Sequence, residues 1–312
     1  MNKKFLITGG TGFIGSNIAN MLVSKGYDVV IFDNNHRGND RRINKKHKNI
    51  KVIKGDIRSL KDLSKAFKNI NAVIHLAYIN GTKYFYSKPD LVLDVAVKGL
   101  INVFDLCLKY KVKEMYLASS SEVYHMPKKI PTDENETLKI PNIFNPRYSY
   151  GGGKILTELY GANFGKKYFK KLIIFRPHNV YGPDMGNEHV IPELLRKFKK
   201  VGKNQKLMIE GTGNETRSFI YISDFCEAFF TLIKKGKHLD IYNIGTERRV
   251  KISKILEIIK KITKKKVKIS RTKLKTGGTK HRCPDIKKIK KLGFKPEVSL
   301  IAGIKKCISH QI

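Results

Sequence analysis

A tyrosine and a lysine four residues apart give the first indication of chemistry in this chain, in the segment Tyr150-Gly-Gly-Gly-Lys154. Residues with this spacing share one face of a helix, so a helical segment here places a phenol beside an ammonium group. The neighbouring positive charge favours the phenolate and lowers the pKa of the tyrosine toward neutrality. Such a phenol can take a proton from an alcohol or sugar hydroxyl while a nicotinamide accepts the hydride. Because the spacing is common by chance, this interpretation depends on the rest of the chain.

Glycines fill all three positions between the tyrosine and the lysine. A glycine in a helix interior costs roughly 1 kcal/mol relative to alanine, so three in a row break a local rule. Three successive glycines therefore indicate either that another part of the chain or a ligand approaches the helix closely, or that the segment has a function. The alternative interpretation is a poorly formed helix start after a loop.

A second polar segment, Ala118-Ser-Ser-Ser-Glu-Val-Tyr124, follows directly from an apolar strand. In a parallel sheet its hydroxyl groups lie at the carboxyl edge, where the ligands of such sheets bind. A serine there can hydrogen-bond the same hydroxyl that Tyr150 deprotonates.

The N-terminal segment predicts the hydride acceptor. A short apolar strand runs into Gly9, Gly12 and Gly15, and an amphipathic helix follows. The glycines let backbone amides approach the phosphates of a dinucleotide, and the start of the helix supplies partial positive charge. The next strand ends in Asp33, near the ~20-residue offset at which a carboxylate reaches an adenosine ribose. The Asp33 carboxylate can accept hydrogen bonds from two hydroxyls of the ribose and would repel a 2′-phosphate, so the predicted cofactor is NAD rather than NADP.

Strands and helices alternate through the first half of the chain, which predicts an α/β fold with a doubly wound parallel sheet. Beyond about Pro177, prolines and glycines break the pattern into short pieces, which indicates a smaller C-terminal α/β lobe. The predicted dinucleotide-binding domain is 1–176, to which 218–245 returns, and the predicted substrate-binding lobe is 177–217 with 246–312. Further strands are predicted at 52–53, 72–76, 115–118 and 172–175, and further helices at 60–67, at 89–110 and from about 150 onward.

The chain has 312 residues and a formal net charge of +37. Lysine carries the charge in every segment, with few aromatic residues in the densest runs, so a generally basic surface is favoured over a specific nucleic-acid site. Such a field attracts anionic substrates. No apolar run approaches the ~18 residues of a membrane span, and the N-terminal apolar stretch is too short for a secretory signal, so we expect a cytoplasmic protein. The four cysteines are widely spaced and predict no metal site.

Together these features resemble the extended short-chain dehydrogenase/reductase family, in its nucleotide-sugar epimerase/dehydratase branch. The resemblance implies a Rossmann-type sheet, bound NAD that is used and returned, and a nucleoside-diphosphate sugar that is oxidised transiently at carbon 4. Family members often dimerise through two helices, here near 91–107 and 155–169, so a homodimer is expected. The motifs that carry the resemblance are Thr8-Gly-Gly-Thr-Gly-Phe-Ile-Gly15, Gly55-Asp-Ile57, His75-Leu-Ala77, Ser119-Ser-Ser-Glu-Val-Tyr124, Tyr150 with Lys154, Arg176-Pro-His-Asn-Val-Tyr-Gly-Pro183, Thr216-Arg-Ser-Phe219 with Asp224, Tyr242-Asn-Ile-Gly245, and Arg282 with Asp285.

The resemblance also implies roles for single residues. Ser120 and Tyr150 handle the 4-hydroxyl, and Lys154 tunes Tyr150 and holds the nicotinamide ribose. Guanidinium groups suit a diphosphate because they pair bidentately with phosphate oxygens. The implied substrate contacts are Ser121, Asn179, Arg217 and Arg282. The implied cofactor contacts are Gly9, Gly12, Phe13, Ile14, Gly15, Asp33, Asn34, Asp56, Ile57, Leu76, Ala77, Tyr78, Ser119, Tyr150, Lys154 and Pro177.

Two departures from the family pattern bear on the site. Where the family usually has Asn-Val-x-Gly-Thr, this chain reads Ala96-Val-Lys-Gly-Leu100, so the cofactor contact of that asparagine must be made differently. His125 stands where a glycine usually follows Val-Tyr.

Glu122 bears on which reaction follows the oxidation. Once carbon 4 is a ketone, the proton on carbon 5 becomes acidic, and a carboxylate can remove it. The segment Ser120-Ser121-Glu122 resembles the glutamate-containing segment of 4,6-dehydratases and UDP-glucuronate decarboxylases. The corresponding segment of 4-epimerases has small or neutral residues. Ser121 replaces the aspartic acid that many dehydratases use to protonate the leaving 6-hydroxyl. Dehydratase-type chemistry is therefore favoured slightly, with an NDP-sugar 4-epimerase or a UDP-glucuronate decarboxylase as alternatives and a solvated loop carboxylate as the other interpretation of Glu122.

A hypothesis of a different class is a non-catalytic dinucleotide-binding protein with a basic surface. The presence of Tyr150, Lys154 and Ser120 together argues against it.

Overall fold

The computed structural model describes residues 2–186, 189–202, 205–273 and 278–311. The chain forms two compact units, which are described separately. The first contains 1–123, 140–177 and 229–242, and the second contains 124–139, 178–228 and 243–312. No helix within the described ranges is long and apolar enough to cross a membrane.

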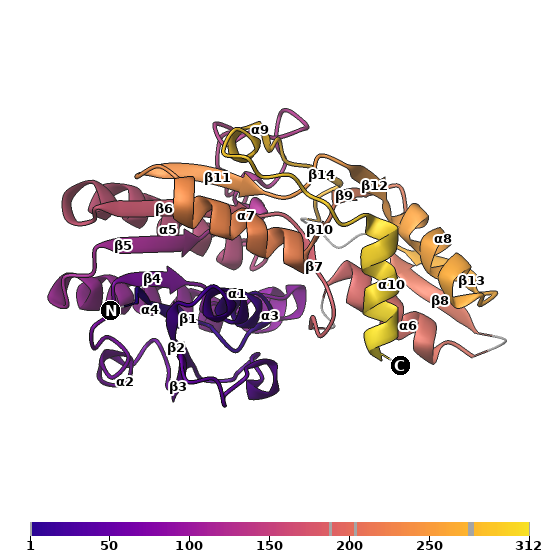
Figure 1. The fold of residues 1–312 in the computed structure, drawn as a ribbon. Coiled ribbons are helices and arrows are strands. Elements are labelled where there is room, and N and C mark those ends of the chain that lie inside the picture. Colours follow the sequence, from indigo (N-terminus) through magenta and orange to yellow (C-terminus); the bar gives the residue numbers. More distant parts are fainter. Residues whose placement is uncertain (1, 187–188, 203–204, 274–277, 312) are drawn as a thin grey trace. The chain divides into compact units, whose positions relative to one another are not determined.

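The first unit is built on a seven-stranded sheet with the order β11-β6-β5-β4-β1-β2-β3 (Figure 1). Neighbouring strands from β3 to β6 run parallel, with Phe5 of β1 opposite both Val29 of β2 and Ala72 of β4. The predicted parallel sheet is therefore confirmed. Its strands are β1 (Lys4–Thr8), β2 (Asp28–Asp33), β3 (Ile50–Lys54), β4 (Ala72–His75), β5 (Glu114–Ala118), β6 (Lys171–Pro177) and β11 (Asp240–Ile244).

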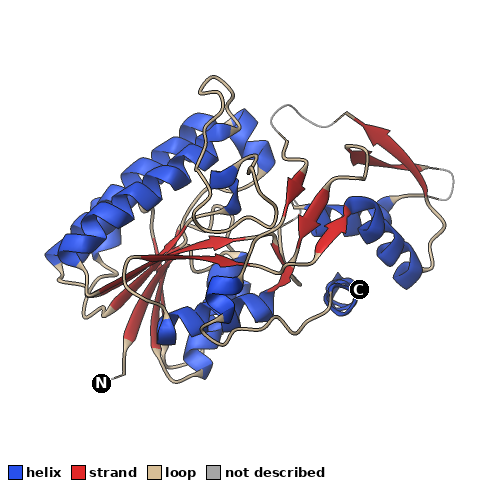
Figure 2. Ribbon diagram, turned by 90° about the horizontal axis from the view of Figure 1, so that it is seen from above, coloured by secondary structure: helices blue, strands red, loops and turns tan. Residues whose placement is uncertain are grey.

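Helices cover both faces of this sheet (Figure 2). Alternate strand residues such as Leu6, Val73 and Leu117 belong to one buried cluster with residues of α4, as the two-residue period of a strand requires. Phe229 of α7 packs edge-on against Tyr116, a strand residue outside that cluster. The helices that carry residues of this unit are α1 (Phe13–Ser24), η1 (Asp40–Arg42), α2 (Leu60–Ser64), α3 (Thr82–Ser87), α4 (Pro89–Lys109), η2 (Ser121–Tyr124), α5 (Tyr148–Tyr168) and α7 (Ile222–Lys235).

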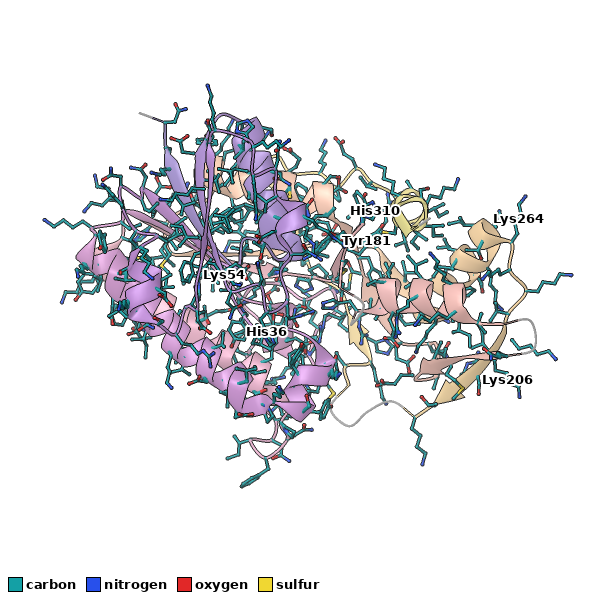
Figure 3. The ribbon with its side chains drawn as sticks, turned by 90° about the horizontal axis from the view of Figure 1, so that it is seen from below. His36, Lys54, Tyr181, Lys206, Lys264 and His310 are labelled. Carbon is teal, nitrogen blue, oxygen red and sulfur yellow. The ribbon has the colours of Figure 1, made fainter. Side chains whose placement is uncertain are left out.

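Among the described residues, the second unit contains three small sheets: β10 pairs with β7, β9 pairs with both β12 and β14, and β13 pairs with β8. Exposed lysines project from its surface, as Lys206 and Lys264 show in Figure 3. Its strands are β7 (Val180–Tyr181), β8 (Lys206–Glu210), β9 (Thr216–Ser218), β10 (Ile220–Tyr221), β12 (Arg249–Lys251), β13 (Lys268–Thr272) and β14 (His281–Arg282). Its remaining helices are α6 (Val190–Lys200), α8 (Ile252–Thr263), α9 (Lys287–Lys290) and α10 (Leu300–Gln311).

The compact units divide the chain differently from the sequence-based expectation at two segments. Residues 124–139 belong to the second unit, where the Thr132 amide donates to the Cys283 carbonyl at 2.9 Å. Only 229–242 of the predicted return segment belongs to the first unit, because β9 and β10 pair with strands of the second. Both assignments depend on contacts between distant segments, which local patterns do not encode.

Candidate active site

The serine segment lies directly after β5, as the sequence predicts. The Ser119 amide donates to the Phe175 carbonyl of β6 at 2.8 Å, which ties the end of β5 to its neighbour. Ser119, Ser120 and Ser121 are all buried, and the Ser120 hydroxyl accepts the Glu122 amide at 3.2 Å. The three serines, of which only Ser121 belongs to η2, are therefore buried at the carboxyl edge of the sheet.

Tyr150 lies in the first turn of α5, a continuous helix that begins before the glycine run. The glycines therefore belong to the body of a 21-residue helix, not to a poorly formed helix start. The Tyr150 ring stacks on Phe85 with centroids 4.9 Å apart, and Tyr78 meets it edge-on at 5.2 Å. These two aromatic neighbours leave Tyr150 only 6% exposed.

Lys154 lies one helical turn after Tyr150 and is 3% exposed. Its ammonium donates to the Ala118 carbonyl at 2.7 Å and lies 5.8 Å from the centroid of the Tyr150 ring. Burial lowers the pKa of Lys154 to about 7, and the negative charge of Glu158 opposes that change only in part. The lysine is therefore poised to change its charge near neutral pH.

A buried ion pair fixes α5 to the sheet one helical turn after Lys154. Arg176 of β6 donates to both oxygens of Glu158 at 2.8 and 2.6 Å, and the Ser119 hydroxyl also donates to this carboxylate. Both charged side chains are at least 95% buried. Glu158 is not among the residues predicted from the sequence, although its i, i+4 spacing from Lys154 is a usable signal.

Glu122 lies beside a second arginine, Arg147, which is not among the residues predicted from the sequence. Its carboxylate is 3.7 Å from the guanidinium of Arg147, the residue just before α5. The Glu122 side chain is 23% exposed, so it is partly covered and not a fully solvated loop carboxylate. No local pattern links positions 122 and 147, because η2 and α5 come together only in the folded chain.

The glycine turn after β1 has the shape of a phosphate cradle. Gly9 adopts φ +74°, and a β-carbon there would lie 2.7 Å from the Ala77 amide nitrogen. A β-carbon on Gly15 would lie 2.3 Å from the Gly9 carbonyl oxygen. Phe13 and Ile14 open α1, and no acidic residue lies in its first turn. The backbone can therefore approach a pyrophosphate closely at the positive end of a helix.

Asp33 ends β2 next to this turn, where a ribose of the same dinucleotide would lie. One carboxylate oxygen accepts the Thr11 amide at 3.0 Å and the other accepts the Asn35 amide at 2.8 Å. Each carboxylate oxygen has two lone pairs, so both retain capacity for a ribose hydroxyl. The residues and backbone of this unit thus fit NAD.

The remaining predicted cofactor contacts lie on the segments that follow or end neighbouring strands. The Asn34 amide group donates to Asp56 at 3.3 Å, and the Ile57 carbonyl accepts from Asn102 of α4 at 2.9 Å. The Leu76 amide donates to the Thr8 carbonyl at 3.1 Å, which holds the segment after β4 beside β1. Leu76, Ala77, Tyr78 and Pro177 follow β4 or end β6.

The second unit brings together two of the predicted substrate residues. Arg217 of β9 and Arg282 of β14 are direct partners across a parallel strand pair. Arg217 donates to the carbonyls of Thr216, Lys280 and Thr279, which fixes its guanidinium, while Asn179 donates to the Ser218 carbonyl at 2.8 Å.

Comparisons with known proteins agree with this arrangement. The sequence model of the NAD dependent epimerase/dehydratase family matches residues 5–245. A protein of Methanocaldococcus jannaschii, provisionally named a UDP-glucose 4-epimerase, is 34% identical over 307 residues, which cover 97% of each chain. The UDP-N-acetyl-alpha-D-glucosaminuronate decarboxylase of Bacillus cytotoxicus is 31% identical over 99% of this chain and 97% of its own.

Among solved structures, a similar one is the UDP-N-acetylglucosamine 4-epimerase from Methanobrevibacter ruminantium M1 in complex with UDP-N-acetylmuramic acid. It superposes with a TM-score of 0.90 at 25% identity and covers 99% of this chain and 98% of its own. With the glycine cradle, Asp33 and the Tyr150–Lys154 pair already in place, the matches lead to one conclusion: the chain belongs to the NAD dependent epimerase/dehydratase family, whose members include nucleotide-sugar epimerases, dehydratases and decarboxylases.

Proposed function

We propose that this protein oxidises a nucleoside-diphosphate sugar transiently at carbon 4 and then converts the 4-keto sugar. The observation that carries the proposal is the pair on α5: Tyr150 is buried one turn from Lys154, a lysine whose pKa is lowered to about 7 by burial. Ser120 lies just after β5, and Ala118, the last residue of that strand, accepts a hydrogen bond from the Lys154 ammonium through its carbonyl. NAD, when bound, supplies the acceptor and later the donor of the hydride at carbon 4.

Tyr150 acts in this proposal as the base for the 4-hydroxyl, and Ser120 orients that hydroxyl by a hydrogen bond. Lys154 stabilises the phenolate electrostatically, which is effective because both side chains are shielded from water. Glu158 is already paired with Arg176, so its charge only partly offsets the burial that lowers the pKa of Lys154. The Tyr150 phenol returns its proton when the 4-keto group is reduced again.

We place Glu122 near carbon 5 of the sugar, where it removes the proton that the 4-ketone makes acidic. The support is its position in η2, two residues after Ser120 and beside Arg147. A guanidinium group 3.7 Å away favours the carboxylate form that such a base requires. This arrangement favours dehydratase-type elimination, although Ser121 supplies no carboxylic acid for the leaving hydroxyl.

A 4-epimerase is the second candidate, because the Methanocaldococcus jannaschii relative and the Methanobrevibacter ruminantium structure both carry 4-epimerase names. An epimerase needs no base at carbon 5, so Glu122 would then be dispensable. A decarboxylase, the activity named for the Bacillus cytotoxicus relative, is a third outcome. Arg217, Arg282 and Asn179 are proposed to hold the diphosphate or the nucleoside in each case.

A panel of UDP-, GDP-, dTDP- and CDP-linked hexoses and hexuronic acids tests the proposal with purified protein. Elimination gives a 4-keto-6-deoxy product that absorbs in alkali, epimerisation gives an isomer resolved by NMR, and decarboxylation releases carbon dioxide. Mass spectrometry of any sugar nucleotide that copurifies identifies the base and the sugar. No turnover of any sugar, together with salt-resistant nucleic-acid binding, would instead support a non-catalytic dinucleotide-binding protein.

A further inference from the structure

Tyr78 occupies space that two small residues provide. It follows the His75-Leu-Ala77 segment at the end of β4, is partly buried, and packs against the buried cluster that contains residues of the sheet, α4 and α5. A β-carbon on Gly153 would lie 1.9 Å from the Tyr78 hydroxyl oxygen and 2.9 Å from the β-carbon of Ala96. Any side chain at position 153 would therefore displace the Tyr78 ring.

This fit accounts for one glycine of the run and not for the others. A β-carbon on Gly152 would meet only the tip of Ile140 at 3.3 Å, and one on Gly151 would meet the Glu122 carbonyl oxygen at an ordinary 3.5 Å. The alanine at position 96 is also the residue that replaces the asparagine of the family pattern. A large residue at 78 and small residues at 96 and 153 thus form one matched set.

The Tyr78 ring lies against the ammonium group of Lys154. The Lys154 ammonium is 3.8 Å from the centroid of the Tyr78 ring, closer than its 5.8 Å to the ring of Tyr150. On its other side the ammonium donates to the Ala118 carbonyl at 2.7 Å. A cation over an aromatic face is attracted by the ring quadrupole, most strongly where water is excluded. Two contacts, one with the ring and one with a carbonyl, therefore hold the ammonium in place.

Hydrogen bonding by the Tyr78 hydroxyl does not explain why a tyrosine occupies this position. Its oxygen is buried and has no hydrogen-bond partner among the described residues. The role that remains is for the ring itself, whose faces and edges contact Lys154 and Tyr150 together.

We propose that Tyr78 is a positioning residue for the Tyr150–Lys154 pair, and that Gly153 and Ala96 are small in order to admit its ring. The importance of that pair for catalysis rests on the proposed function, whereas the contact itself does not. The other charged or titratable groups near Lys154 are His75, which burial keeps neutral by lowering its pKa to about 3, and Glu158, which is paired with Arg176.

The first test measures Lys154 without requiring turnover. In protein labelled with ¹³C at the ε-carbon of lysine, one resonance should titrate near pH 7 and disappear in Lys154→Arg. Tyr78→Leu keeps an apolar neighbour but removes the ring face, so the Lys154 pKa should fall by about half a pH unit or more. Tyr78→Phe retains the ring and should leave this pKa within about 0.2 of the parent value. A Lys154 pKa that does not fall in Tyr78→Leu overturns the proposal.

The second test is a double-mutant cycle. Gly153→Ala should lower kcat at least about 20-fold, and Gly152→Ala, the matched control in the same run, should change it less than about 3-fold. Tyr78→Phe in the Gly153→Ala background removes the atom that clashes most severely, at 1.9 Å, while the 2.9 Å contact with the Ala96 β-carbon remains, so it should restore kcat at least about 5-fold but not fully. Equal losses from Gly153→Ala with Tyr78 and with Phe at position 78 would refute the coupling. If the parent protein turns over no sugar, the proposed function fails, while the ¹³C titration still decides the role of Tyr78.

Discussion

Replacing Lys154 by methionine should remove activity and yet stabilise the folded protein at acidic pH. Burial lowers the pKa of this lysine from 10.5 to about 7, so the folded chain binds the proton less tightly than the unfolded chain does. At roughly 1.4 kcal/mol per pH unit, the protonated side chain costs the fold about 5 kcal/mol at and below pH 6. That cost decreases as the pH rises from about 7 to 10.5, because the lysine is already neutral in the folded state and the unfolded chain gives up its proton more and more easily.

Methionine fills a similar volume without the charge, but it also removes the hydrogen bond to the Ala118 carbonyl. An unpaired buried carbonyl costs about 1–3 kcal/mol, so the net gain at pH 6 should be about 2–4 kcal/mol. For a chain of this size that corresponds to a rise in Tm of about 5 °C. At pH 10 the gain should vanish or reverse, because the protonation cost has fallen to about 1 kcal/mol while the hydrogen bond to Ala118 is still lost.

Differential scanning fluorimetry of Lys154→Met and the parent between pH 5.5 and 10 measures this dependence. Lys166→Met is the matched control, because Lys166 is exposed on the same helix, and it should shift Tm by less than about 1 °C at any pH. A lower Tm for Lys154→Met at pH 6, or a difference independent of pH, would show that the ammonium group is not buried at a cost.

Three further predictions concern Glu122, the buried ion pair and the oligomer. Glu122→Gln should still reduce its bound NAD when substrate is added but should accumulate the 4-keto sugar; unchanged product formation would assign Glu122 a role outside catalysis. Glu158→Gln should lower the free energy of unfolding by about 3–5 kcal/mol, because it leaves Arg176 buried without its partner, and Glu158→Gln with Arg176→Met should regain part of that loss in urea titrations. The chain should form a homodimer through α4 and α5, on which Leu93 and Leu159 are 43% and 56% exposed. The double variant Leu93→Lys with Leu159→Lys should therefore be monomeric in light scattering, whereas dimers of unchanged affinity would place the interface elsewhere.

The dinucleotide half of the site could be predicted from sequence because its signals are local. A strand, a glycine turn, a helix and Asp33 follow one another within about 30 residues, and each step constrains the backbone directly. The helix through Tyr150 and Lys154 was predictable for the same reason, since spacing alone places both on one face.

Contacts between distant segments were not predictable. Arg147 meets Glu122, and Tyr78 meets Gly153, only because separate loops and helices pack together at the sheet edge. The glycine run was recognised as a broken local rule, but the residue that required Gly153 lies 75 positions earlier in the chain. The compact units differ from the predicted domains at 124–139 for the same reason, because the Thr132 amide finds its backbone partner at Cys283.

The most direct test of the central claim is single-turnover absorbance at 340 nm with Tyr150→Phe and its parent, each loaded with NAD and mixed with the sugar nucleotide that the panel identifies. The parent should show NADH forming and decaying within one turnover. The phenylalanine variant should bind NAD with an affinity within about 3-fold of the parent and form NADH at least about 100-fold more slowly, because the base for the 4-hydroxyl is gone. NADH formation at the parental rate in Tyr150→Phe would contradict the account.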